Sequence, residues 1–434
     1  MKSATWTCIT AMALCAALAL PSALNAQSQQ QNSKQTRYYV FNLGAPLGGN
    51  SGPVGINDIG WSSGSSNLTG DGTTHAELWV GAPFDLGTLG GPNSAVAWPN
   101  HSVRGEVVGI AETADADPLQ ENWSCSAFFP TVTHNICLGF VWQDGVMTQL
   151  PTLGGYNGYA AGVNNRGQVV GWAENTVHDS TCIPPQVLQF EAVIWGPKLG
   201  QLTPLPPYPG DVDTAATAIN DQGQVVGISG ICDVAVGRFS AKHAVLWQNG
   251  TPIDLGNFDG GVAWNTPVAI NNRGQVVGFV NLPDDQDGGI NPIGFIWSKE
   301  HPIQKLNPLP DDTNSVGFDI NDKGQVVGQS IGAASSAVLW QDGQIIDLNM
   351  AIQANSSLSL QLAQGINDSG EITGTALDTT TNQLVGFLAV PVGGAGKAAS
   401  ATAQAANRVV LSGSNRQQLA RRMGMAQAVM AKAH

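Results

Sequence analysis

The chain has 434 residues, of which only 12% are charged, and its formal net charge is −14 at pH 7. Residues 392–434 hold six of the 18 basic residues and no acid, and Lys2 lies in the N-terminal segment. The rest therefore carries 11 basic against 32 acidic residues, a net charge of −21. Such a surface repels nucleic acid and anionic lipid, so neither is an expected partner.

The N-terminal segment has the layout of a secretory signal peptide. Lys2 gives a positive start, residues 9–20 form an apolar run, and Ala26 ends a stretch of small residues. The run is too short to span a membrane, and no later segment reaches about 18 apolar residues. We therefore predict a signal peptide over residues 1–26, a polar linker over 27–37, and a secreted or periplasmic protein without a transmembrane segment.

From residue 38 onward the sequence repeats. The segment NNRGQVVG occurs at 164–171 and again at 271–278, within a longer series of N-[DN]-x-G turns followed by short β-branched strands. The series is marked by its turn glycines: Gly60, Gly105, Gly167, Gly223, Gly274, Gly324 and Gly370. A period of roughly 40–50 residues with β-type content is typical of propeller blades.

One unit contains four predicted strands. Residues 218–219, 224–227, 244–247 and 252–255 are apolar or β-branched, and tight turns join the first pair and the last pair. The Asp of each N-D-x-G turn is interpreted as a turn former. A lone unit cannot bury its faces, so the units must stack around an axis.

The two ends of the repeat region predict how the ring closes. The region starts at a fourth strand (38–43) and stops at a third strand (386–390), so pairing these two removes an open edge. The sequence therefore predicts an all-β fold over residues 38–391. It is a seven-bladed β-propeller of four-stranded antiparallel blades, closed by the N-terminal strand.

The strand motifs also carry a family resemblance. HAELW (75–79) and HAVLW (243–247), with N-[DN]-x-G-Q-V-V-G units and DLGTLGG-like residues around them, resemble the HAF repeat of predicted extracellular bacterial proteins. The full His-Ala-Phe triplet is absent here. The resemblance implies export and a repeat fold, and it implies no activity.

Connections that break the repeat indicate where function resides. Two connections in each unit stay short, whereas 110–137, 172–190, 228–242 and 279–293 are long and divergent. Alternating strand directions place all the variable connections on one face, which is where rigid scaffolds usually carry function. The repeated tryptophans are instead predicted to be inter-blade core; they are Trp79, Trp142, Trp195, Trp247, Trp297 and Trp340.

The variable connections supply the candidate site residues. Aromatic planes beside carboxylates suit a sugar ligand, and the alternative is that these loop residues pack under one another. The candidates are Trp98, Tyr156, Tyr208, Trp264, Asp211 and Asp259. The run Asp284, Asp285 and Asp287 is a candidate Ca²⁺ site without EF-hand spacing, for which an ordinary acidic loop is the alternative. No other cofactor is expected.

Four cysteines remain after signal cleavage, and an even number in an oxidising compartment indicates disulfides. Cys125 and Cys137 lie in one long loop, whereas Cys182 and Cys232 lie in equivalent loops of successive units. We therefore predict the pairs 125–137 and 182–232.

No hydrolase, metalloprotease or phosphate-loop motif is present. The sequence favours a monomeric binding or scaffold module for a carbohydrate or protein ligand on the long-loop face. One alternative is a polysaccharide-active enzyme, a glycosidase or lyase, with carboxylates on that face. The other is a structural envelope protein. The tail, residues 392–434, is low in complexity and basic, with helix formers near its end.

Overall fold

The structure is a computed structural model that describes residues 36–121, 123–198, 200–233, 239–258, 264–281, 291–392 and 408–422. The predicted signal peptide, residues 1–26, lies outside these ranges, as does most of the linker. No helix of the described residues has the length and apolar character that a membrane crossing requires.

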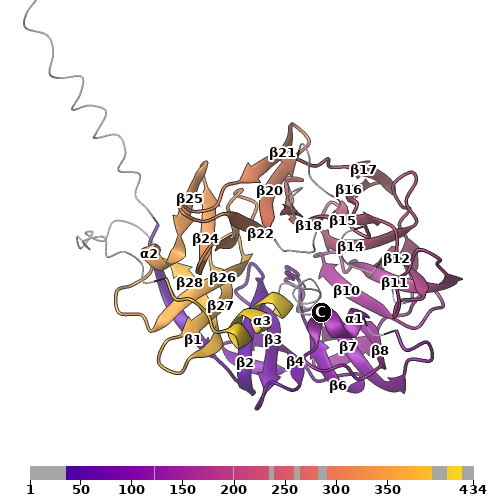
Figure 1. Cartoon of the computed structure of the whole chain (residues 1–434), viewed down its shortest axis with the longest axis horizontal. Helices are drawn as coiled ribbons and strands as arrows, with labels where there is room; N and C mark the ends of the chain where they lie inside the picture. The colour runs from indigo at the N-terminus through magenta and orange to yellow at the C-terminus, as the bar shows by residue number, and fades with distance from the viewer. Residues whose placement is uncertain are drawn as a thin grey trace, which may run out of the picture.

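Seven four-stranded antiparallel sheets surround a common axis, so the predicted propeller is confirmed (Figure 1). Blade 1 contains β2 (Gly48–Ile56), β3 (Ser62–Leu68), β4 (Thr74–Val80) and β5 (Ala82–Asp85). Blade 2 contains β6 (Gly90–Ala95), β7 (Val107–Ala116), β8 (Asn135–Gln143) and β9 (Val146–Gln149). Blade 3 contains β10 (Gly158–Val163), β11 (Val169–His178), β12 (Leu188–Trp195) and β13 (Leu202–Pro204). Blade 4 contains β14 (Asp213–Ile219), β15 (Val225–Gly230), β16 (His243–Gln248) and β17 (Thr251–Asp254). Blade 5 contains β18 (Asn265–Ile270), β19 (Val276–Asn281), β20 (Pro292–Ser298) and β21 (His301–Leu306). Blade 6 contains β22 (Asn314–Ile320), β23 (Val326–Ile331), β24 (Ser335–Gln341) and β25 (Gln344–Asp347). Blade 7 contains β26 (Leu358–Ile366), β27 (Ile372–Asp378), β28 (Gln383–Pro391) and β1 (Tyr38–Gly44). The helices are α1 (Trp123–Phe128), α2 (Leu348–Ala351) and α3 (Gly413–Arg422).

The N-terminal strand closes the ring, as the ends of the repeat region predicted. β1 pairs antiparallel with β28, with Tyr38 opposite Pro391 and Val40 opposite Ala389. In Figure 1 the indigo start of the ring lies beside its orange-yellow end. Tyr38 and Val40 are buried in the core of blade 7, so this pairing supplies apolar packing as well as backbone hydrogen bonds.

Each N-[DN]-x-G turn is folded by its first Asn. In blade 4, Asn220 Oδ1 accepts hydrogen bonds from the backbone N–H groups of Gln222 at 3.1 Å and Gln224 at 3.0 Å. Gly223 has φ +80°, in the left-handed region that glycine adopts without steric cost. Asn220 Nδ2 also donates to the backbone carbonyl of Asn271 in the next blade, at 3.0 Å, so the turn residue links neighbouring blades.

The second residue of these turns, which we interpreted from the sequence as a turn former, also bonds to the neighbouring blade. Asp221 is more than a local turn former, because its carboxylate accepts from the backbone N of Asn165 at 2.8 Å and from its side chain at 2.9 Å. Asp368 N likewise donates to Asp58 Oδ1 at 2.9 Å. The turns converge around the axis, so their short side chains reach the adjacent blade and tie the blades together.

Four of the six repeated tryptophans, Trp79, Trp195, Trp247 and Trp340, are buried as predicted, whereas Trp142 and Trp297 are only partly buried and pack against the apolar clusters. Trp247 is 1% exposed, and its Nε1 donates to the carbonyl of Pro206 in the preceding blade at 2.7 Å. Trp195 makes the equivalent bond to Pro151 at 2.9 Å. A buried indole with a hydrogen-bonded N–H is well stabilised, so these residues hold the blades together.

Candidate functional site

The long connections gather on one face of the ring, which we call the loop face. It carries the described parts of three connections of blades 2 to 4, residues 117–121 with 123–134, 179–187, and 231–233 with 239–242, and α1 lies within the first of them. The tail helix α3 also lies on this face and contacts α1 (Figure 1). Variable loops, a helix and the tail therefore meet on one side of the molecule.

Both predicted disulfides are confirmed, and both lie on the loop face. Cys125–Cys137 joins the start of α1 to β8 within blade 2. Cys182–Cys232 joins the connections of blades 3 and 4, which are 50 residues apart in sequence. A cross-link between separate loops restricts their relative movement, so this face is rigidly built.

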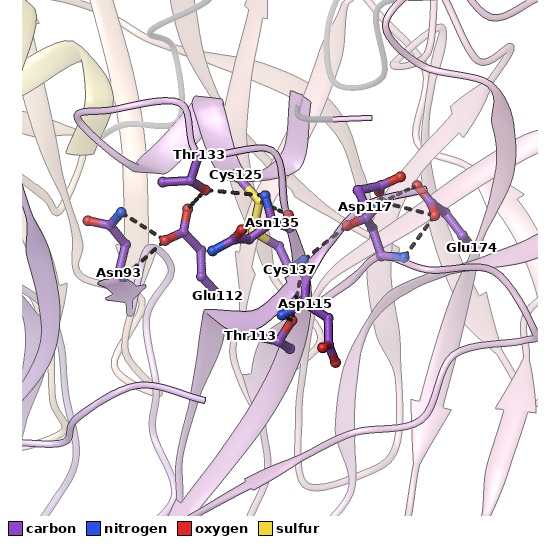
Figure 2. The surroundings of a disulfide bond; sticks show 11 residues. Asn93, Glu112, Thr113, Asp115, Asp117, Cys125, Thr133, Asn135, Cys137 and Glu174 are labelled. Carbon is purple, nitrogen blue, oxygen red and sulfur yellow. Dashed lines mark hydrogen bonds between the residues drawn. A yellow bond between two sulfur atoms is a disulfide. The ribbon is translucent and has the colours of Figure 1, made fainter. Parts of the chain in front are cut away.

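Carboxylates surround the Cys125–Cys137 disulfide (Figure 2). On one side, Glu112 accepts from Asn93 N at 3.1 Å, from Asn93 Nδ2 at 2.9 Å and from Thr133 Oγ1 at 2.5 Å. On the other side lie Asp117 and Glu174. Glu112 and Glu174 are fully buried, so they support the loops from beneath and do not meet solvent.

Burial changes the acidity of several of these groups. Burial, followed by the neighbouring Glu121 carboxylate, raises the pKa of Glu174 to about 8. Burial also raises the pKa of Asp213 to about 8, and the adjacent Asp179 carboxylate adds to this shift. Glu121, Glu174 and Asp213 are each 0% exposed, so none of the three is accessible to a polysaccharide chain.

The predicted aromatic residues occupy different environments. Trp264 is 8% exposed and packs edge-on against Phe279 in the apolar cluster around the axis, and the half-buried Trp98 contacts the same cluster. Tyr156 is 37% exposed on the loop face. The remaining candidates Asp259, Asp284, Asp285 and Asp287 lie outside the described residues.

Two predicted residues of blade 4, Tyr208 and Asp211, do come together. Asp211 Oδ2 lies 2.7 Å from His243 Nδ1 and accepts from Ser229 Oγ at 2.8 Å. The ring centroids of Tyr208 and His243 are 4.6 Å apart. The backbone N of Tyr208 donates to Ser229 Oγ at 2.9 Å. Lys242 Nζ is 4.0 Å from Asp211 Oδ1, so this carboxylate attracts two basic groups.

The tail binds to an equivalent carboxylate in blade 6. Ser330 Oγ donates to Asp312 Oδ2 at 2.6 Å, which matches the Ser229–Asp211 pair. Arg408 donates both terminal nitrogens to this carboxylate, at 2.8 and 2.5 Å. It also donates to Ser336 Oγ and to the carbonyl of Ala334, each at 2.9 Å. A bidentate Arg–carboxylate pair with two further bonds is a strong and directional contact.

Beyond Arg408, the tail runs across the loop face. Leu411 and Leu419 are 5% and 3% exposed and join the apolar cluster around the axis. Asn67 Nδ2 donates to Gln418 Oε1 at 3.3 Å, and Asn415 Nδ2 donates to the carbonyl of Asn382 at 3.4 Å. The segment therefore makes ionic, polar and apolar contacts with the ring. Sequence reasoning missed this docking, although a tail without acids beside a ring (residues 38–391) with 9 basic against 32 acidic residues was a signal for it.

Sequence reasoning also missed a contact between His101 and Asp319 on the opposite face. On that face the N-[DN]-x-G turns line a pocket of about 60 Å³. His101 Nε2 is 3.1 Å from Asp319 Oδ1, across the axis, and His101 Nδ1 is 3.3 Å from the carbonyl of Ile56. Burial lowers the pKa of His101, but the fully buried Asp319 outweighs this and raises it to about 9. The signal was a break in the repeat, because the position before the turn is Ile or Val in the other six units.

Comparison with known proteins gives one partial match to a family model and weak similarities to solved structures. The model of a family described as "Protein of unknown function (DUF3466)" matches residues 210–420, just under half of the chain. No curated protein matches the sequence.

Among solved structures, the chain is similar to a virginiamycin B lyase from Staphylococcus aureus, with 10% identity, 82% of this chain and 99% of that chain covered, and a TM-score of 0.44. A gluconolactonase from Xanthomonas campestris gives 11% identity, 83% and 96% coverage, and a TM-score of 0.35. An acylaminoacyl peptidase from Pyrococcus horikoshii gives 10% identity and a TM-score of 0.41; 76% of this chain is covered, and it spans only 50% of the peptidase. At these values no activity is carried over to this chain.

Proposed function

We propose that the chain is an exported, non-catalytic binding module whose loop face recognises a basic polypeptide segment. The observation that carries this proposal is the contact between Arg408 and Asp312. The tail lies on the loop face in the manner of a bound peptide, with a guanidinium held by a buried carboxylate and leucines inserted beside the axis. The ring thus already receives a segment of this chemistry from its own chain.

The chemistry of the ring supports this class of ligand. The ring is acidic, and the tail contains six basic residues and no acid. Complementary charge speeds encounter and selects among partners. The Ser–Asp pair that holds Arg408 recurs in blade 4, where Asp211 attracts Lys242 and His243. The loop face therefore presents at least two carboxylates that attract cations.

Rigidity supports a binding role for the same face. Two disulfides and a network of buried hydrogen bonds fix the loops of blades 2 to 4 before any ligand arrives. A preorganised surface loses little conformational entropy on binding. The disulfides also support export, because they persist in oxidising compartments, and the HAF-like repeats imply the same location.

A carbohydrate ligand is the second candidate, and one observation favours it. Tyr156 is 37% exposed on the loop face, and its backbone N is held by Glu174 Oε2 at 3.2 Å. A fixed, exposed aromatic ring stacks well on the C–H face of a sugar.

The test is to screen the full-length wild type and its Arg408→Ala variant on peptide and glycan arrays. Loss of the Arg408 contact weakens docking of the tail, so we expect the variant to bind basic peptides more strongly than the wild type. Glycan binding without peptide binding would favour the second candidate. Equal peptide signals from the two proteins would contradict the proposal.

A further inference from the structure

Three buried acids meet between the loops of blades 2 and 3, and we call them the buried acid cluster. Asp117 and Glu121 come from the 117–134 connection, and Glu174 comes from β11. Their exposed fractions are 1%, 0% and 0%. Asp117 and Glu174 lie beside each other near the Cys125–Cys137 disulfide (Figure 2).

The negative charge of this cluster lacks a direct counter-charge. Among the described residues, none of the three carboxylates forms an ion pair with Lys, Arg or His. The exposed His178 acts on Glu121 only at longer range. Neutral donors give partial compensation, since Asn157 Nδ2 donates to Asp117 Oδ2 at 2.7 Å and to Glu174 Oε2 at 3.2 Å. Buried carboxylates held only by neutral groups are costly, on the order of several kcal/mol each.

Two oxygens at this place have no hydrogen-bond donor among the described residues: Glu121 Oε2 and Gln186 Oε1. Gln186 is 2% exposed, and its amide orientation is fixed, because Nε2 donates to Glu174 Oε1 at 3.1 Å and to the carbonyl of Leu188 at 2.8 Å. Glu121 is also fixed, since its other oxygen accepts from the backbone N–H groups of Val187 and Leu188 at 2.7 and 2.6 Å. Unpartnered buried oxygens are rare in native proteins and call for a ligand that pairs with oxygen.

We propose that the buried acid cluster binds Ca²⁺ through side-chain oxygens of Glu121, Glu174 and Gln186, with Asp117 beside them. The donors are all oxygens, which hard cations prefer, and the cysteines nearby are oxidised and cannot act as thiolate ligands. Ca²⁺ accepts six to eight oxygens in irregular geometry, whereas Mg²⁺ demands an octahedron and retains several waters. A site without solvent exposure therefore suits Ca²⁺ better than Mg²⁺.

The distances between the acidic side chains determine how the cluster must adjust when it binds Ca²⁺. Among the described residues, the group that brings three candidate ligand atoms within 4.8 Å of one another is Glu112, Cys125 and Cys137, whose sulfurs are bonded to each other. The three acids of the cluster do not all lie within this distance of one another, so binding an ion requires a local side-chain adjustment. Glu121 already links the loops of blades 2 and 3 through Val187 and Leu188, and the ion adds an ionic cross-link to these bonds and to the two disulfides.

The experiment uses the full-length protein, treated with a chelator and then titrated with CaCl₂ or MgCl₂ up to about 10 mM, which covers weak extracellular sites. We expect CaCl₂ to raise the melting temperature by about 2–4 °C at tenfold excess over Kd, and MgCl₂ to raise it less. In the variant Glu121→Gln, we expect no response to CaCl₂. We also expect a melting temperature in chelator above that of the wild type, because repulsion with Glu174 is removed.

Glu112→Gln is the matched control, since Glu112 is equally buried on the same face but accepts bonds from Asn93 and Thr133. Its response to CaCl₂ should equal that of the wild type. Three outcomes would overturn the proposal: no response in the wild type, a full response in Glu121→Gln, or equal responses to Mg²⁺ and Ca²⁺. If both variants unfold, direct calorimetric titration of the wild type with CaCl₂ still decides, and absence of binding heat refutes the site.

Discussion

Several residues of this ring form hydrogen bonds across blade boundaries. Asn220 folds its own turn and donates to the next blade, while Asp221 accepts from the preceding one. Asp213 acts in the same way across blades 3 and 4, because it accepts from Phe190 N at 3.0 Å and faces Asp179. A change at one such residue is therefore felt at a blade boundary.

The raised pKa of Asp213 gives a pH-dependence with a definite sign. The folded state holds this proton up to about pH 8, whereas the unfolded state releases it near the ordinary aspartate pKa of 3.8. The folded state thus binds more protons between these values, and stability falls as pH rises from about 4 to about 8. One such proton changes the free energy of unfolding by at most about 1.4 kcal/mol per pH unit.

We expect Asp213→Asn to flatten this fall, because Asn keeps an acceptor for Phe190 and donates to Asp179 at every pH. The measurement is the free energy of unfolding at several values between pH 5 and 8. A fall should remain in both proteins, because Glu174 with a raised pKa of about 8 and His101 with a raised pKa of about 9 also lose protons as the pH rises through this range. Parallel curves for variant and wild type would show that Asp213 does not retain the proton.

At the scale of elements, the loop face is made rigid by connections that the repeat does not require. The Cys182–Cys232 bond links the loops of two blades, whereas Cys125–Cys137 joins α1 to β8 within blade 2 over a separation of 12 residues. In the chain-entropy account, the larger loop restricts the unfolded chain more, by roughly 4 against roughly 3 kcal/mol.

We therefore expect the double substitution Cys182→Ser, Cys232→Ser to lower the free energy of unfolding more than Cys125→Ser, Cys137→Ser does. The measurement is denaturant unfolding of both variants beside the wild type. The reverse order would mean that native packing around each bond, and not the length of chain that it closes, sets its contribution.

At the scale of the whole molecule, closure by β1 makes seven blades into one cooperative body. Deleting residues 27–44 removes Tyr38 and Val40, whose buried side chains contribute about 1.5–3 kcal/mol each. We expect a single unfolding transition shifted down by about 5 °C or more, measured by calorimetry. An unchanged melting temperature, or a separate transition for blade 7 alone, would contradict cooperative closure.

The repeat accounts for how much of this molecule was predictable. The recurring turn asparagines and strand tryptophans predicted seven blades. The β1–β28 pair was predicted because the repeat region starts at a fourth strand and stops at a third strand. The apolar burial of Trp264 was not predictable, because an aromatic residue in a divergent loop has the same pattern whether it packs inside or meets a ligand. Docking of Arg408 on Asp312 was not predictable either, since it joins a non-repeating tail to a loop 96 residues away.

The central claim is that the loop face binds basic polypeptide, and calorimetric titration with a synthetic peptide of residues 408–422 tests it most directly. The full-length Arg408→Ala variant should bind this peptide, and the wild type should bind it more weakly because its own tail competes. Adding Asp312→Asn should reduce affinity by about 10- to 100-fold, the effect of losing a charge-assisted contact, whereas adding Asp342→Asn in an exposed turn should not. Equal affinity in the Asp312→Asn and Asp342→Asn proteins, or no binding to any of them, would contradict the account.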